Sequence, residues 1–231
     1  MSFRERAGRH PAIDGVWERA PGAPARVLVP ADGCVDLLVR ERPGHEPVVV
    51  VLPPTVRAEV ATIARGERAW GVRTALGRGG ALAVRAELAT LRAVAAIERG
   101  DGVVGVEGVV ADLLDDRGPP PAVVVEIVAL ARNERGAARI VGRRVAGRSA
   151  RTLERACRAW LGYGPKTLLA IERGRGALPR IVAGEPLADV AADLGYADQP
   201  HMTREISRLF GRTPGALRRV GNLQDATALV R

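Results

Sequence analysis

The C-terminal half of the chain contains an internal repeat with an offset of 49 residues. Each copy begins with a segment in which small or apolar residues recur at i, i+3, i+4 and i+7, a spacing typical of one helix face. These residues are Ala138, Val141, Gly142 and Val145 in the first copy, and Leu187, Val190, Ala191 and Leu194 in the second. The repeat therefore predicts two similar helical units.

Each segment is followed by a break and then by a residue suited to cap a helix, Ser149 or Asp198. A second helix is predicted after each cap, and both copies stop at a glycine with a proline three residues later. The predicted buried stripes are Leu153, Cys157, Trp160 and Leu161, and Met202, Ile206, Leu209 and Phe210. A helix, a short turn and a second helix form a helix-turn-helix, so we expect two such units, at residues 137–162 and 186–211.

The exposed side of each second helix carries side chains that suit nucleic acids. Arginine can donate two hydrogen bonds to guanine or bind phosphate, and a helix fits the major groove of DNA. Arginines on one isolated helix are more often solvated charges, but the duplication favours DNA. The candidate DNA-binding residues are Ser149, Arg151, Thr152, Glu154, Arg155, Arg158, Asp198, Gln199, His201, Thr203, Arg204 and Arg208.

The charge distribution supports this interpretation. Residues 1–121 contain 16 arginines and 16 acidic residues, whereas residues 122–231 contain 19 basic and 10 acidic residues, which accounts for the whole net charge of +9. A basic region beside a neutral one is typical of a protein that binds a polyanion. Arginine-rich composition from GC-rich coding is the alternative explanation.

The N-terminal half favours a different fold class. Short apolar or alternating runs at 25–29, 35–40, 48–52, 60–64 and 69–73 predict strands, and 81–98 and 104–114 have helical spacing. The run DDRGPPP at 115–121 cannot continue a helix and indicates a spacer. We therefore predict an α+β protein: a β-rich, barrel-like sensing or dimerisation domain at 1–118, an all-α domain at 119–220, and a tail at 221–231. Residues 167–182 would form a rigid connector that sets the spacing of the two units. If both units read one face of a duplex, their second helices should lie about 34 Å apart.

The residues of the repeat resemble the AraC/XylS family of bacterial transcription regulators. The strongest stretch is residues 184–199, GEPLADVAADLGYADQ, continuing through Arg204 to FGRTP at 210–214; the first copy, 149–165, is a weaker match. The resemblance covers about residues 122–220. It implies two helix-turn-helix subdomains joined by a long helix that bind promoter DNA in successive major grooves. It also implies base-reading roles for Arg151, Glu154, Arg155, Gln199, Thr203 and Arg204.

The sequence departs from the family at three places. Cys157 and Ile206 stand where the family commonly has phenylalanine, which predicts smaller cores, with Trp160 filling the first. Pro200 lies in the opening turn of the last reading helix and reduces its hydrogen-bonding potential. The stretch PADGCVDLL at 30–38 resembles an N-terminal domain found before some AraC-type regulators.

An enzyme is the alternative class, because AraC-type units also occur in DNA-alkylation repair proteins that transfer the alkyl group to cysteine. That chemistry needs clustered cysteines, and this chain has only Cys34 and Cys157, far apart. The histidines are scattered as well, so we expect no enzyme activity, no metal and no cofactor. Asp32 and Asp36 are expected to have structural roles.

The remaining expectations concern partners and location. No apolar run is long enough to span a bilayer and no secretory signal is recognisable, so we expect a cytoplasmic protein that does not interact with membranes. The expected partners are double-stranded promoter DNA and RNA polymerase. A small-molecule effector, with Trp17 and Trp70 lining its pocket, and a homodimer are additional hypotheses.

Overall fold

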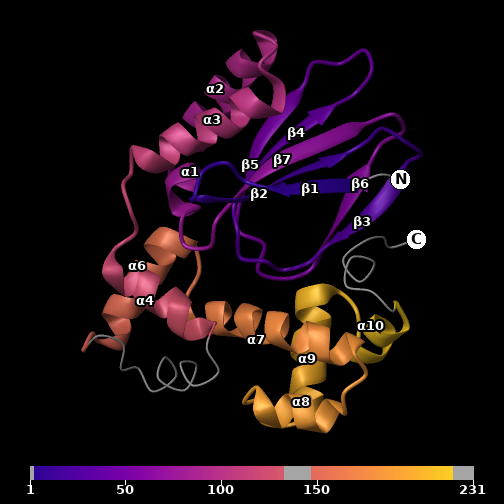
Figure 1. Cartoon of the computed structure of the whole chain (residues 1–231), viewed down its shortest axis with the longest axis vertical. Helices are drawn as coiled ribbons and strands as arrows, with labels where there is room; N and C mark the ends of the chain where they lie inside the picture. Colours follow the sequence, from indigo (N-terminus) through magenta and orange to yellow (C-terminus); the bar gives the residue numbers. More distant parts are fainter. Residues whose placement is uncertain (1–2, 133–146, 221–231) are drawn as a thin grey trace.

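The computed structural model describes residues 3–132 and 147–220. Within these residues seven strands come first and helices follow them, joined by turns and loops (Figure 1). The strands are β1 (Phe3–Ala7), β2 (Ile13–Arg19), β3 (Ala25–Val29), β4 (Asp36–Glu41), β5 (Val48–Leu52), β6 (Glu59–Ile63) and β7 (Arg68–Thr74). The helices are α1 (Gly80–Val84), α2 (Ala86–Glu98), α3 (Gly102–Asp115), α4 (Ala122–Ala131), α6 (Ala150–Leu161), α7 (Pro165–Val182), α8 (Leu187–Asp193), α9 (Gln199–Phe210) and α10 (Pro214–Val220). This arrangement confirms the predicted α+β class.

The strands form two antiparallel sheets. Five strands pair in the order β1-β2-β7-β4-β5, and β3 pairs with β6 in a separate two-stranded sheet. In the central ladder Leu37 of β4 faces Val72 of β7, and both side chains are fully buried. The predicted β-rich region is confirmed, although these two sheets share no ladder among the described strands and so do not close into one barrel.

Helices α1, α2 and α3 belong to the core of the five-stranded sheet. Helix α2 packs against α3 and β5, and α3 contacts β7. Apolar residues of these helices, including Ala89, Val106 and Leu113, join Trp70 and Leu37 in one buried cluster. The helices lie along one side of the sheet in Figure 1.

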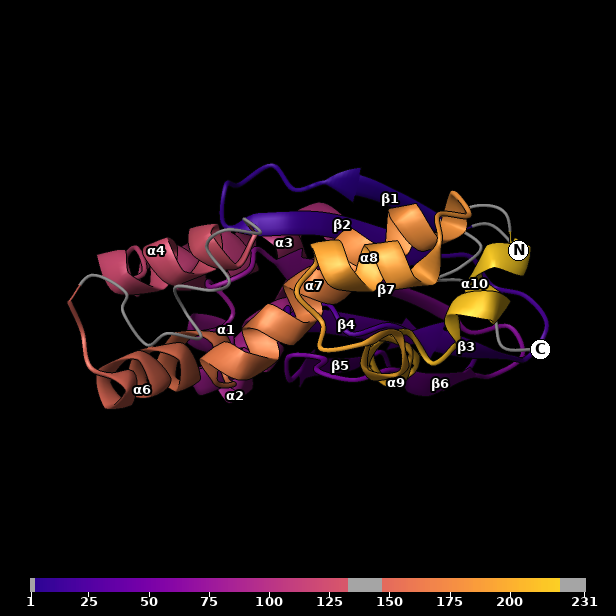
Figure 2. The same ribbon diagram turned by 90° about the horizontal axis from the view of Figure 1, so that it is seen from below.

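The helices from α4 onward share a second core, which includes Ile127, Leu168, Ile171, Ile206 and Leu209. Helix α7 runs from the group of α4 and α6 to the group of α8, α9 and α10 (Figure 1). In the view from below, α6 lies across the picture whereas α9 is seen along its axis, so these two helices are inclined to each other (Figure 2).

Several sequence predictions need correction in detail. β1 and β2 were not predicted, and the single helix expected at 81–98 is divided at Arg85, whose backbone (φ −110°, ψ 28°) is not helical. The predicted first helix of the first unit, near Ala138–Val145, and the 221–231 tail lie outside the described residues. The boundary at residue 118 stays a prediction, although the two cores divide the chain near that point. No helix of the described chain is both long and apolar enough to cross a bilayer.

Candidate nucleic-acid interface

Helices α6 and α9 begin and end in the same way. Each is 12 residues long, and the side chain of its N-cap residue accepts a backbone hydrogen bond: Ser149 from Thr152 N at 3.3 Å, and Asp198 from His201 N at 2.6 Å. Each ends at a glycine in the left-handed region, Gly162 (φ 84°) and Gly211 (φ 66°). The predicted caps and stops are therefore confirmed, because only glycine adopts this conformation without steric cost.

The buried faces of these helices agree with the predicted stripes except at one residue. Leu153, Cys157 and Leu161 are buried in α6, and all four predicted residues are buried in α9. The prediction for Trp160 is wrong: its side chain is only partly buried, and the Arg117 guanidinium lies 4.2 Å from its ring centroid. The ring thus covers an arginine from the spacer instead of filling the space left by Cys157.

The exposed face of α6 carries two arginines without ion-pair partners in the described chain, Arg151 and Arg155. Arg158 differs, because its Nε donates to Glu154 Oε1 at 2.8 Å, one helical turn away. Thr152 bonds with the hydroxyl of Ser149 and so belongs to the cap. Of the predicted α6 residues, Arg151 and Arg155 are the most available to a ligand.

The exposed face of α9 presents Gln199 and Arg204 to solvent, with Thr203 partly exposed between them. His201 lies edge-on to Tyr196, at 5.4 Å between ring centroids, and supports the turn before the helix. Arg208 is exposed, but its Nη1 donates to the carbonyl oxygen of Val56 in the N-terminal region at 2.9 Å. The side chains of Gln199, Thr203 and Arg204 make no hydrogen bond or ion pair within the described chain, so they are the α9 side chains most available to a ligand.

A residue that the sequence analysis missed fixes the position of α9. The Arg173 guanidinium, from α7, stacks over the Tyr196 ring at 4.6 Å and binds Glu205 of α9 at 3.2 Å. Burial is the main reason why the pKa of Tyr196 is raised above its ordinary value. No sequence pattern would have identified Arg173, because its partners are 23 and 32 residues away.

The two cysteines are free, buried thiols. Burial raises the pKa of Cys157 to about 12 and that of Cys34 further still. A thiol with so high a pKa is almost entirely protonated at neutral pH and is a poor nucleophile. Neither thiol therefore suits alkyl transfer, and no group of three or more possible metal ligands occurs among residues 3–132 and 147–220.

Asp32 and Asp36 flank a single arginine. Their carboxylate oxygens lie 3.0 and 3.4 Å from Arg73 Nε, and Asp36 also accepts a hydrogen bond from Trp17 Nε1 at 3.1 Å. Burial raises the pKa of Asp32 to about 6 despite this arginine. The arrangement agrees with the structural roles expected for the two acids.

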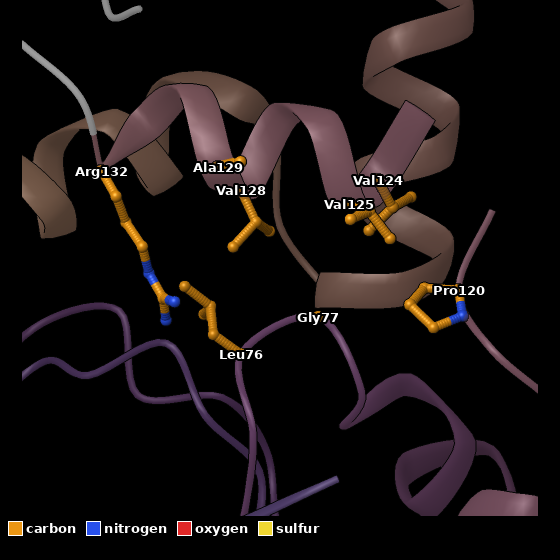
Figure 3. A pocket seen from close by; sticks show the side chains of 8 residues that line it. All are labelled: Leu76, Gly77, Pro120, Val124, Val125, Val128, Ala129 and Arg132. Atoms are coloured by element: carbon orange, nitrogen blue, oxygen red, sulfur yellow. The ribbon is translucent and has the colours of Figure 1, made fainter. Parts of the chain in front are cut away.

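Figure 3 shows a groove on the described surface, and the tryptophans suggested for an effector pocket do not line it. Trp70 is 1% exposed within the first core, and Trp17 stacks on Phe3. The groove has a volume of about 210 Å³ and runs between α4 and the loop after β7. It is lined by Leu76, Gly77, Pro120, Val124, Val125, Val128, Ala129 and Arg132. Its volume is below the range of about 300–1,000 Å³ typical of small-molecule sites.

Comparison with known proteins bears on the helical region. Residues 144–220 match a protein-family model described as a helix-turn-helix domain. The match covers the whole second unit and the capped second helix of the first. The C-terminal region is an AraC-type helix-turn-helix domain. The match confirms the resemblance that was inferred from the repeat for this region of the chain.

The comparisons identify no family for the part of the chain outside the AraC-type domain. No curated protein matches the sequence. Two structures of ToxT from Vibrio cholerae are similar over 93% of this chain and 97% of theirs. One, at 1.65 Å resolution, has a TM-score of 0.42 at 10% identity; the other, from strain O395 and bound to (E)-4-(8-methylnaphthalen-1-yl)but-3-enoic acid, has a TM-score of 0.37 at 9% identity. Similarity this low supports no conclusion about the present chain.

Proposed function

We propose that the protein is a sequence-specific transcription regulator that reads two adjacent major grooves of promoter DNA with α6 and α9, which we call the reading helices. The observation that carries the proposal is the duplication. Two helices of equal length, with equivalent caps and stops, each present to solvent an arginine that has no ion-pair partner among the described residues. Structural arginines are usually paired, whereas a DNA-reading helix must leave its donors free.

The residues of the reading helices divide by their contacts. Arg151 and Arg155 on α6, and Gln199, Thr203 and Arg204 on α9, are proposed to contact bases or phosphates directly. Ser149, Thr152, Asp198 and His201 support the helix starts, where they position the free N–H groups for a phosphate. Glu154 and Arg158 hold each other and are proposed to contact DNA only if their pair opens.

The inclination of the two helices has a consequence for the bound DNA. Reading helices that enter successive grooves of a straight duplex must be nearly parallel, because the grooves are related by a translation of about 34 Å. Since α6 and α9 are inclined to each other, we expect a duplex that contacts both to bend.

The regulatory partners belong to the same proposal. We propose that the bound protein contacts or excludes RNA polymerase, and that it acts without enzymatic activity. One chain carries two reading helices, so a monomer could cover two grooves, and a homodimer would extend the recognised site. An effector of the N-terminal region is proposed without an assigned site.

The test is a fluorescence-anisotropy titration of the full chain with duplexes selected from a random pool, against random duplex as competitor and at several salt concentrations. We expect binding of the selected duplex to survive the competitor. The plot of the logarithm of the binding constant against the logarithm of the salt concentration should have a slope that corresponds to several phosphate contacts. Joint replacement of Arg151, Arg155 and Arg204 by alanine should abolish this preference. The matched control replaces three exposed N-terminal arginines, Arg4, Arg65 and Arg92, and should retain it. Equal, weak binding of both duplexes by the unmodified chain would contradict the proposal.

A further inference from the structure

Two N-terminal segments lie against the ends of both reading helices. Residues 28–33 and 54–58, here called the bracket, join each other through the amides of Asp32 and Gly33, which donate to Thr55 O at 3.1 and 2.9 Å. The bracket therefore behaves as one piece, although its halves are more than 20 residues apart in the sequence.

The bracket holds the end of α9 through its backbone. Ala31 N donates to Leu209 O, and Ala58 N donates to Arg208 O, each at 2.8 Å. The last carbonyls of a helix have no partner within the helix, so these two amides supply what α9 itself cannot. The Arg208 side chain completes the contact by donating to Val56 O.

The same bracket also holds the end of α6. Tyr163, which directly follows the C-cap Gly162, is buried and donates its hydroxyl hydrogen to Gly33 O at 3.1 Å. A methyl group built on Gly33 would lie 2.3 Å from this hydroxyl oxygen, so the two segments are in close contact.

Both C-cap glycines face bracket side chains at close range. A methyl group on Gly162 would lie 2.9 Å from Pro54, and one on Gly211 would lie 2.6 Å from Leu28. The left-handed glycines that end the two reading helices are therefore also points of close approach between the N-terminal region and each unit.

Apart from the bracket, the described chain connects the reading helices through α7 and through packing in the shared core. Helix α7 has 18 residues and so spans about 27 Å. A single helix fixes the distance between the groups of helices at its two ends. It restricts less strongly the rotation of one group relative to the other. The bracket supplies a second connection between the same two groups, and a closed loop of connections removes that rotation.

We propose that the bracket fixes the placement of the two reading helices relative to each other, and thereby sets the separation of the two DNA subsites that the protein accepts. Tyr163 and Arg208 act as positioning residues in this scheme. The inference rests on the proposed function for its DNA part, but the fixed placement is a property of the free protein.

The first experiment therefore uses no DNA. Spin labels on Arg155→Cys and Arg204→Cys, in the full chain with its two buried cysteines retained, report the distance between the reading helices. We expect one narrow distribution. Ala58→Pro, which deletes the amide that donates to Arg208 O, together with Tyr163→Phe, which deletes the hydroxyl, should broaden it. Arg57→Ala is the control, since Arg57 is exposed in the same segment and its side chain lies 3.9 Å from the exposed Glu59.

The second experiment uses the selected duplex of the preceding section, with the spacing between its subsites changed by two base pairs. We expect the unmodified protein to lose affinity about tenfold, or about 1.4 kcal/mol, and the double variant to lose less than about threefold. Arg57→Ala should behave like the unmodified protein. Tyr163→Phe alone serves if Ala58→Pro does not fold, and it should give a smaller loss of spacing preference.

The outcomes separate the two proposals. A distribution that is broad in the unmodified chain, or equally narrow in the variants, overturns the bracket whatever the DNA results. A narrow distribution that the variants broaden, combined with no preference for any duplex, supports the fixed placement but overturns its role in DNA binding along with the proposed function.

Discussion

The reading helices α6 and α9 have the same length and end signals, but their side chains are used differently. The last arginine of α6, Arg158, pairs with Glu154 of the same helix, whereas the last arginine of α9, Arg208, donates to Val56 of the N-terminal region. The buried sides differ as well: α6 has Cys157 where α9 has Ile206. Duplicated units thus keep their backbone signals while their side chains adapt to separate surroundings.

The largest difference should appear in stability. Ile206→Ala removes three carbon atoms from a fully buried site and should lower the free energy of unfolding by about 2–4 kcal/mol. Cys157→Ala removes one sulfur atom and should cost about 1 kcal/mol. Urea denaturation of both variants measures the contrast, and equal losses would show that the two cores tolerate truncation equally.

A change that acts through the bracket should affect both units together. The pKa of Asp32 is raised from 3.8 to about 6 by burial, so the folded state favours the neutral acid. This contribution is fully present below pH 3.8 and is lost as the pH rises through 6. From pH 4 to 8 the unfolding free energy should fall by up to about 3 kcal/mol more than in Asp32→Asn. Denaturation at several pH values tests this, and parallel pH profiles would contradict it.

Replacing Arg204 should affect the binding of specific and random DNA differently. Arg204→Ala should weaken binding of the selected duplex by about 1–3 kcal/mol and leave random-duplex binding nearly unchanged, as expected for an arginine that contacts a base edge. Anisotropy titrations with both duplexes measure the two effects. Equal losses on the two duplexes would instead make Arg204 a phosphate contact.

The N-caps should be equivalent. Ser149→Ala and Asp198→Ala each remove the acceptor of the first-turn amide and should each lower stability by about 1 kcal/mol. Thermal unfolding of the two variants compares them directly. A loss at Asp198 several times larger than at Ser149 would show that the two helix starts are not equivalent.

The smallest effect is expected at the exposed pair of α6. Arg158→Ala removes an ion pair between residues four apart and should change stability by about 0.3–0.5 kcal/mol. Its effect on DNA binding should be well below that of Arg155→Ala, because Arg158 is already paired. Titration of both variants at low salt provides the measurement, and equal effects would show that the pair opens on DNA.

The sequence predicted the parts of the fold that depend on local signals. Ser149, Asp198, Gly162 and Gly211 act within one or two helical turns, and the structure confirms all four. Strand β1 was not predicted because all five residues of FRERA are exposed and the segment has no apolar alternation. Backbone pairing to β2 and the ion pair between Arg6 and Glu107 hold it in place.

The sequence could predict which face of each reading helix is exposed. It could not predict which side chains on that face are already bonded to other parts of the protein. Helical spacing placed Arg155, Arg158, Arg204 and Arg208 on the outer sides correctly. It could not show that Arg208 is bound to Val56, because this contact joins residues 152 positions apart. Trp160 was misplaced because its partner, Arg117, comes from the spacer.

The position of Ala31 limits how this architecture could be inherited. Although it belongs to the strand-rich half, Ala31 is 3% exposed within the core of the AraC-type domain. A gene fusion that attached residues 119–231 to a different sensor would leave a vacancy in that core and two unpaired carbonyls at the end of α9. A new sensor would have to provide a small apolar residue and two amides at the same place. The halves of this protein are therefore expected to evolve as a matched pair and not as exchangeable modules.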